Sequence, residues 1–123
     1  MKHKVLLVDD NELELFALRE LFEAEGYEVD TAENGLFARE MVKEKEYDII
    51  ITDLVMPVSD GIQFLYSLGT SGREIPVIVL TGFNRIDNML NAFQMGAVDV
   101  LYKPYDISQL LELCAKVLKK KQL

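Results

Sequence analysis

Four short, mainly apolar runs recur along the 123-residue chain, and a polar or charged residue follows each of them. A short apolar run of this kind is typical of a strand buried on both faces, as in a parallel sheet. The runs cover residues 5–8, 49–52, 77–80 and 98–102, and they are followed by Asp9 and Asp10, by Asp53, by Thr81 and by Lys103. A weaker, alternating run over residues 27–32 predicts an edge strand.

Helical patterns alternate with these runs and cover about residues 12–25, 36–46, 61–68, 85–95 and 108–120, with Gly26 and Gly96 as stop signals. The predicted core faces are Ala17, Leu18, Leu21 and Phe22 in the first helix, Ala38, Met41 and Val42 in the second, and Leu110, Leu111, Cys114, Val117 and Leu118 in the last. Five β-α units predict an α/β fold with helices on both faces of a parallel sheet. Such folds bind ligands beyond the carboxyl ends of their strands.

The composition narrows the classes of function. Hydrophobic residues make up 50% of the chain and charged residues 28%, which indicates a soluble globular domain. The net charge of −8 argues against direct binding of nucleic acid. No apolar run could span a membrane or serve as a signal peptide, so a cytoplasmic location is expected. The single cysteine, Cys114, is expected to be a buried thiol.

The polar residues at the strand ends belong to longer motifs. Val8-Asp9-Asp10, Asp53-Leu54-Val55-Met56-Pro57 with Asp60-Gly61, Thr81-Gly82 and Lys103-Pro104 follow one another along the chain. In order and spacing, the set resembles the receiver domains of two-component response regulators, over nearly the whole chain. The resemblance implies one receiver domain over residues 1–123, with a flavodoxin-like doubly wound fold. Its five-stranded parallel sheet would have the order 2-1-3-4-5, with five helices.

In that order the first and third strands are neighbours, about 4.8 Å apart, so Asp9, Asp10 and Asp53 crowd together. Protons or a cation must relieve their repulsion, and a hard divalent ion with oxygen ligands fits this need. The resemblance implies Mg²⁺ bound directly by Asp10, Asp53 and the backbone carbonyl of Val55. Asp9 would act mainly through a bound water molecule.

The resemblance also implies the reaction. Asp53 would be the phosphorylation site, a carboxylate nucleophile that forms an aspartyl phosphate. The hydroxyl of Thr81 would hydrogen-bond the phosphoryl group, and the long side chain of Lys103 would bring a positive charge to it. Gly82 would leave room for the group to enter, and the bond between Lys103 and Pro104 is expected to be cis.

The implied partners are a histidine kinase or a histidine phosphotransfer protein as donor, and a downstream output domain or protein. Phosphorylation would switch the face formed by the fourth helix, fifth strand and fifth helix, with a phosphorylation-dependent dimer as a further option. The protein would be a signalling phosphoacceptor rather than an enzyme, although it would catalyse its own phosphorylation and slow dephosphorylation. The sequence leaves open the cognate kinase, the pathway, and whether this receiver is free-standing or part of a longer regulator.

Other interpretations exist for each motif taken alone. Asp9, Asp10 and Asn11 could merely cap a helix, as could Thr81, and Lys103 could be a solvated lysine. A magnesium-dependent phosphohydrolase would need an Asp-x-Asp motif after the first strand, and a flavin mononucleotide carrier would need a phosphate loop there. A degenerate receiver would lack the acceptor aspartate or the lysine. The joint occurrence of the motifs favours a functional receiver.

Four positions give expectations specific to this chain. Receivers usually carry a tyrosine or phenylalanine three residues before the lysine, where this chain has Val100, and Tyr102 lies on the same strand face nearer the site. Val55 and Phe83 cannot orient a water molecule, which predicts slow loss of the phosphoryl group; the alternative for Phe83 is packing against the fourth helix, away from the site.

The first helix offers a further expectation. Leu13 and Phe16 lie off the predicted core face of this helix, which starts at the carboxyl ends of the strands. Two interpretations remain open for them: ordinary scattered apolar residues on a surface, or a docking patch for the phosphodonor.

Overall fold

The computed structural model describes residues 2–53, 64, 66–68, 74–82 and 96–121. Its elements are β1 (Lys4–Val8), α1 (Glu12–Ala24), β2 (Glu28–Ala32), α2 (Gly35–Glu44), β3 (Ile49–Asp53), β4 (Val77–Thr81), β5 (Asp99–Tyr102) and α5 (Ile107–Lys121). Residues 64 and 66–68 are also helical, within the expected third helix. The expected fourth helix, about residues 85–95, lies outside the described residues.

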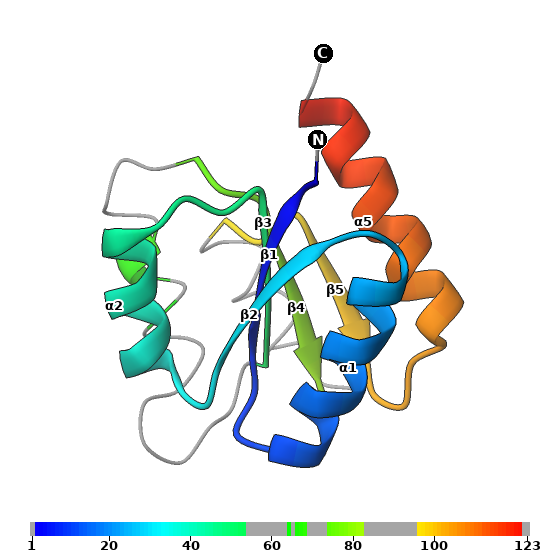
Figure 1. Ribbon diagram of the computed structural model, residues 1–123, viewed down its shortest axis with the longest axis horizontal. Helices are drawn as coiled ribbons and strands as arrows, with labels where there is room; N and C mark the ends of the chain where they lie inside the picture. The colour runs from blue at the N-terminus through cyan, green and yellow to red at the C-terminus, as the bar shows by residue number, and fades with distance from the viewer. Residues whose placement is uncertain (1, 54–63, 65, 69–73, 83–95, 122–123) are drawn as a thin grey trace.

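All five strands are parallel, and their order is β2-β1-β3-β4-β5, as predicted. Helices α1 and α5 lie on one face of the sheet and α2 on the other, so the fold is doubly wound (Figure 1). The strands run toward the lower edge of the view, where α1 begins, and their carboxyl ends meet there. No helix among the described residues is long and apolar enough to cross a membrane.

The face under α1 and α5 is an apolar layer built from alternate strand residues. The strands contribute Val5, Leu7, Ile49, Ile51, Ile78 and Leu80, and the helices contribute Leu15, Leu18, Phe22, Leu110, Cys114 and Leu118. The predicted stripe of the last helix is therefore confirmed, and Cys114 is a fully buried free thiol. Burial raises the pKa of the Cys114 thiol to about 12, which keeps it protonated near neutral pH.

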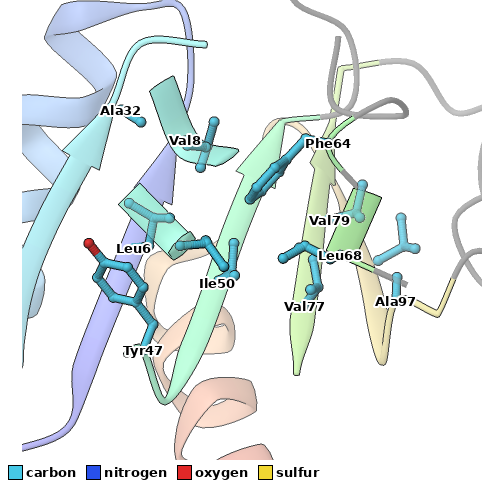
Figure 2. Close-up of a cluster of buried hydrophobic side chains, with 13 residues drawn as sticks. Leu6, Val8, Ala32, Tyr47, Ile50, Phe64, Leu68, Val77, Val79 and Ala97 are labelled. Atoms are coloured by element: carbon cyan, nitrogen blue, oxygen red, sulfur yellow. The ribbon is translucent and has the colours of Figure 1, made fainter. Parts of the chain in front are cut away.

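The opposite face carries the second apolar layer, shown in Figure 2. Leu6, Ile50, Val77 and Val79 project from the strands, and Phe64 lies over the middle of the sheet. Ala38 and Val42 of α2 are buried there, and Met41 packs against them at partial burial, as the helical spacing predicted. Because side chains alternate along each strand, one strand supplies both layers.

Two expectations about burial were wrong. Ala17 and Leu21 are exposed, and the buried stripe of α1 is Leu15, Leu18 and Phe22. The two stripes share Leu18 and Phe22, and the rotation of the helix against the sheet selects between them. Strand β5 is not buried on both faces, since only Val100 among its residues is buried. Strand β5 lies at the edge of the sheet and pairs with β4 alone.

Asparagine side chains determine where the first two helices begin. Asn11 Oδ1 accepts a hydrogen bond from the amide of Glu14 at 3.1 Å, and Asn34 Oδ1 accepts one from the amide of Phe37 at 2.9 Å. Each bond satisfies an amide that has no partner within its helix. After α1 the chain turns at Gly26, whose φ of 93° is a left-handed conformation that glycine adopts readily. The cap at Asn11 places the first turn of α1 directly beside the carboxyl end of β1.

Candidate functional site

Three carboxylates meet at the carboxyl edge of the sheet. Asp9 and Asp10 follow β1, and Asp53 ends β3, which pairs with β1 in parallel register. One oxygen from each carboxylate lies within 4.8 Å of the others. Asp9 is 3% exposed, Asp10 is exposed and Asp53 is partly exposed. The cluster therefore opens to solvent on the side of Asp10.

The backbone after β1 contacts the side chain of Asp9. The amide of Asn11 donates a hydrogen bond to Asp9 Oδ1 at 3.0 Å, and this leaves Oδ2 directed toward the site. Of the three residues that could have capped the helix, Asn11 is the one whose side chain caps α1. Asp9 and Asp10 belong to the carboxylate cluster.

Lys103 reaches the cluster from beyond β5. Its Nζ lies 3.1 Å from Asp53 Oδ2, 3.2 Å from Asp9 Oδ2 and 3.2 Å from Glu14 Oε2. The amide of Lys103 donates to the carbonyl of Thr81 at 2.7 Å, and this fixes the segment after β5 against β4. The bond between Lys103 and Pro104 is cis, as expected.

Burial and charge act on this group in opposite directions. Burial raises the pKa of Asp9 to about 7, with smaller contributions from Glu14 and Asp53, against the lowering effects of the Asn11 amide and of Lys103. Partial burial alone would lower the pKa of Lys103, but the carboxylates of Asp53 and Asp9 outweigh it and raise that pKa above its ordinary value. Lys103 therefore stays charged and neutralises part of the cluster.

Thr81 and Gly82 lie on the next strand. Thr81 is buried at the end of β4, one strand away from Asp53, whose own partner in the register is Leu80. A Cβ atom added to Gly82 would meet nothing within 4 Å, so the space beside it is open. The two predicted residues Val55 and Phe83 lie outside the described residues.

Two residues of the site were missed by the sequence reasoning, Glu14 and Tyr105. Glu14 contacts Lys103, and the Tyr105 hydroxyl donates to Glu14 Oε1 at 3.3 Å. The available signal for Glu14 was its place in the first turn of a helix that begins right after Asp9 and Asp10. The signal for Tyr105 was its position two residues after Lys103.

Comparison with known proteins identifies the family to which this fold belongs. The family model for the response regulator receiver domain matches residues 5–115. This chain belongs to the response-regulator receiver family. Accepting a phosphoryl group is the function of that family in two-component systems, and its members interact with kinases or phosphotransfer proteins. The phosphohydrolase and flavin-carrier interpretations are therefore set aside.

Individual relatives differ in how much of their length this receiver matches. It is 38% identical to the transcriptional regulatory protein ZraR of Klebsiella oxytoca, over 86% of this chain but 24% of that protein. It is 32% identical to sporulation initiation phosphotransferase F of Bacillus subtilis (strain 168), over 96% of this chain and 95% of that protein. The receiver domain of a Francisella response regulator superposes with a TM-score of 0.93 at 29% identity, covering 98% of this chain and 99% of that one.

The carboxylate cluster fits a divalent cation, and receivers are generally dependent on Mg²⁺. Oxygen donors are what Mg²⁺ prefers, and an ion that keeps several waters suits a cluster open to solvent at Asp10. The distance that joins the three oxygens is short enough for all of them to face one ion. Asp9, Asp10 and Asp53 are thus the residues that could hold it.

Proposed function

We propose that Asp53 is the phosphoryl acceptor of this receiver, within one domain over residues 1–123. The observation that carries the proposal is the contact of Lys103 Nζ with Asp53 Oδ2 at 3.1 Å, beside two further carboxylates. A degenerate receiver that only binds partners would lack the acceptor or the lysine, and this chain has both.

In the proposed reaction, a carboxylate oxygen of Asp53 attacks the phosphorus of the donor. The bond from phosphorus to the donor nitrogen or oxygen breaks as the bond to Asp53 forms, and the donor keeps the electron pair. Lys103 offers its positive charge to the phosphoryl oxygens, and the hydroxyl of Thr81 donates a hydrogen bond to them. Positioning and charge neutralisation are most of what phosphoryl transfer requires, so the receiver catalyses its own phosphorylation.

The proposed direct ligands of Mg²⁺ are Asp10, Asp53 and the backbone carbonyl of Val55, and Asp9 would act mainly through a bound water molecule. These residues would hold the ion, and its charge would neutralise one phosphoryl oxygen. The proposed donor is a histidine kinase or histidine phosphotransfer protein, and the location is cytoplasmic. The same proposal includes an output, which is a further domain, a separate protein or a phosphorylation-dependent dimer. It also includes slow dephosphorylation, because Val55 and Phe83 cannot orient a water molecule.

Incubation with Mg²⁺ and acetyl phosphate tests the acceptor. We expect a mass increase of one phosphoryl group that hydroxylamine removes, and we expect Asp53→Asn to abolish it without loss of the fold, since the change is nearly isosteric. Asp99→Asn is the matched control, because Asp99 begins β5 at the opposite end of the strand from Lys103. Labelling of Asp53→Asn at the wild-type stoichiometry would refute the assignment.

A further inference from the structure

We infer that Glu14 is a positioning residue that holds Lys103 back from the phosphoryl group in the resting receiver, and that Tyr105 orients Glu14 for this task. The inference rests on the proposed function of Asp53 and Lys103. Its basis is a carboxylate whose two oxygens have different partners. Glu14 Oε2 lies 3.2 Å from Lys103 Nζ, and Oε1 accepts a hydrogen bond from the Tyr105 hydroxyl at 3.3 Å.

The contact between Lys103 and Glu14 occupies one of the few hydrogen-bond donors of the ammonium group. A lysine ammonium has three N–H donors, and Lys103 directs them at Asp9, Asp53 and Glu14. A new hydrogen bond to a phosphoryl oxygen therefore requires one of these contacts to be released. In the resting state all three carboxylates compete for the same cation.

Solvent exposure indicates which contact is released. The side chain of Asp9 is 5% exposed, that of Asp53 is 13% exposed, and that of Glu14 is 24% exposed. A carboxylate that loses its cation is stabilised best where water can replace it, because an unpaired buried charge is costly. Glu14 is also a negative charge that repels an incoming phosphoryl group. The hold of Glu14 on Lys103 and its repulsion of the phosphoryl group both oppose phosphorylation.

Tyr105 connects this contact to the start of α5. Its ring packs against the apolar layer under α1 and α5, as does Ile107, the first residue of α5. When Lys103 leaves Glu14, the Tyr105 hydroxyl keeps a partner whose charge is no longer neutralised. Release of the Lys103–Glu14 contact thus changes the electrostatic surroundings of Tyr105, just before α5. This coupling does not involve Val100.

Binding of beryllofluoride, a phosphoryl mimic, at saturating Mg²⁺ tests the inference by titration calorimetry. We expect Glu14→Gln to tighten binding about fivefold, as for the loss of one partly screened charge contact. Damage to the fold would weaken binding instead, so a gain in affinity separates positioning from a structural role. Glu12→Gln is the matched control, since Glu12 is an exposed carboxylate in the same first turn of α1. Glu14→Ala should reproduce the gain.

Tyr105→Phe removes the hydroxyl and keeps the ring. We expect a smaller gain than for Glu14→Gln, and no further gain when the two changes are combined, because Tyr105 acts through Glu14. Unchanged or weaker binding in Glu14→Gln, or an equal gain in Glu12→Gln, would overturn the inference, and additive effects would overturn the part assigned to Tyr105. Failure of the wild type to bind the mimic would instead refute the proposed function beneath it.

Discussion

At the residue scale, Val100 and Lys103 lie on one short segment and have opposite surroundings. Val100 belongs to the apolar layer that also holds Val79 and Phe64, and it is 9% exposed. Tyr102 pairs with Thr81 in the register and is only partly buried. The position where receivers usually have a switch aromatic is therefore a packed aliphatic core residue. Lys103, one residue beyond β5, is the charged group of the segment.

Replacing Lys103 by glutamine should have two opposite effects. The loss of its charge from Asp9 and Asp53 should tighten Mg²⁺ binding about tenfold, which is about 1.4 kcal/mol, because the ammonium and the cation compete for the same carboxylates. Labelling by acetyl phosphate should slow by at least about tenfold, since a phosphoryl oxygen loses its positive partner. Calorimetry and intact mass measure the two effects. Lys45→Gln, which breaks an ion pair with Asp30 at 3.3 Å, is the control and should change neither.

At the scale of elements, α1 carries both the capped start beside the site and an exposed apolar surface. Leu13 is 82% exposed and Phe16 is 64% exposed, whereas Leu15 and Leu18 of the same helix are buried. Leu36 and Phe37 in the first turn of α2 are exposed to a comparable degree, at 50% and 55%. Any donor that transfers to Asp53 must approach the edge at which α1 begins.

Leu13→Glu and Phe16→Glu should therefore slow phosphoryl transfer from a cognate donor protein about tenfold or more, as expected for apolar anchors at a docking surface. Transfer from acetyl phosphate should be unchanged, because a small donor needs no docking surface. Val98→Glu is the matched control for an added charge on an exposed apolar residue, because Val98 precedes β5 at the opposite edge of the sheet. Equal slowing with both donors would contradict docking through α1.

At the scale of the whole molecule, the site couples to stability because its ligands come from distant parts of the chain. Asp9 and Asp53 are brought together by the pairing of β1 with β3, and Lys103 by that of β4 with β5. A ligand that binds this arrangement and not the unfolded chain stabilises the fold by mass action.

Millimolar Mg²⁺ should therefore raise the melting temperature by several degrees, as a binding energy of about 1 kcal/mol does for a domain of this size. Asp10→Ala should lose most of the shift, because it removes the exposed carboxylate of the cluster. Melting curves with Mg²⁺, without it and with chelator provide the measurement. An equal shift in wild type and Asp10→Ala would exclude this residue as a ligand.

A second global prediction concerns pH and a cluster away from the site. Burial alone would raise the pKa of Asp30, but hydrogen bonds from Tyr47 and Lys45 outweigh it, and the pKa lies below its ordinary value of 3.8. A carboxyl with a lowered pKa contributes stability that is present above its unfolded-state pKa and lost as the pH falls through the folded-state pKa. Asp30→Asn should thus reduce stability to urea at pH 7, and the difference from wild type should shrink below about pH 4. A difference independent of pH would contradict this origin.

The sequence by itself was enough for the five strands, for the first, second and last helices, for the fold class, for the edge position of β2 and for the apolar stripe of α5. These features follow from local periodicity and from the polar residues that end each strand. The family motifs were sufficient for the strand order and for the expectation that Asp9, Asp10, Asp53 and Lys103 come together. Local patterns could do this because each of these residues lies at the end of a strand, and the carboxyl ends of parallel strands share one edge.

Only the tertiary structure decided which face of α1 is buried, since the stripe through Leu15 and the one through Leu21 both include Leu18 and Phe22. It also decided that Val100 is the one buried residue of β5, where the sequence predicted burial of the whole strand. The contact of Glu14 with Lys103 depends on the same information, because 89 residues separate the two in sequence. The periodicity of apolar residues in the sequence does not specify how a helix is rotated or where a lysine side chain ends. Both depend on packing across the sheet.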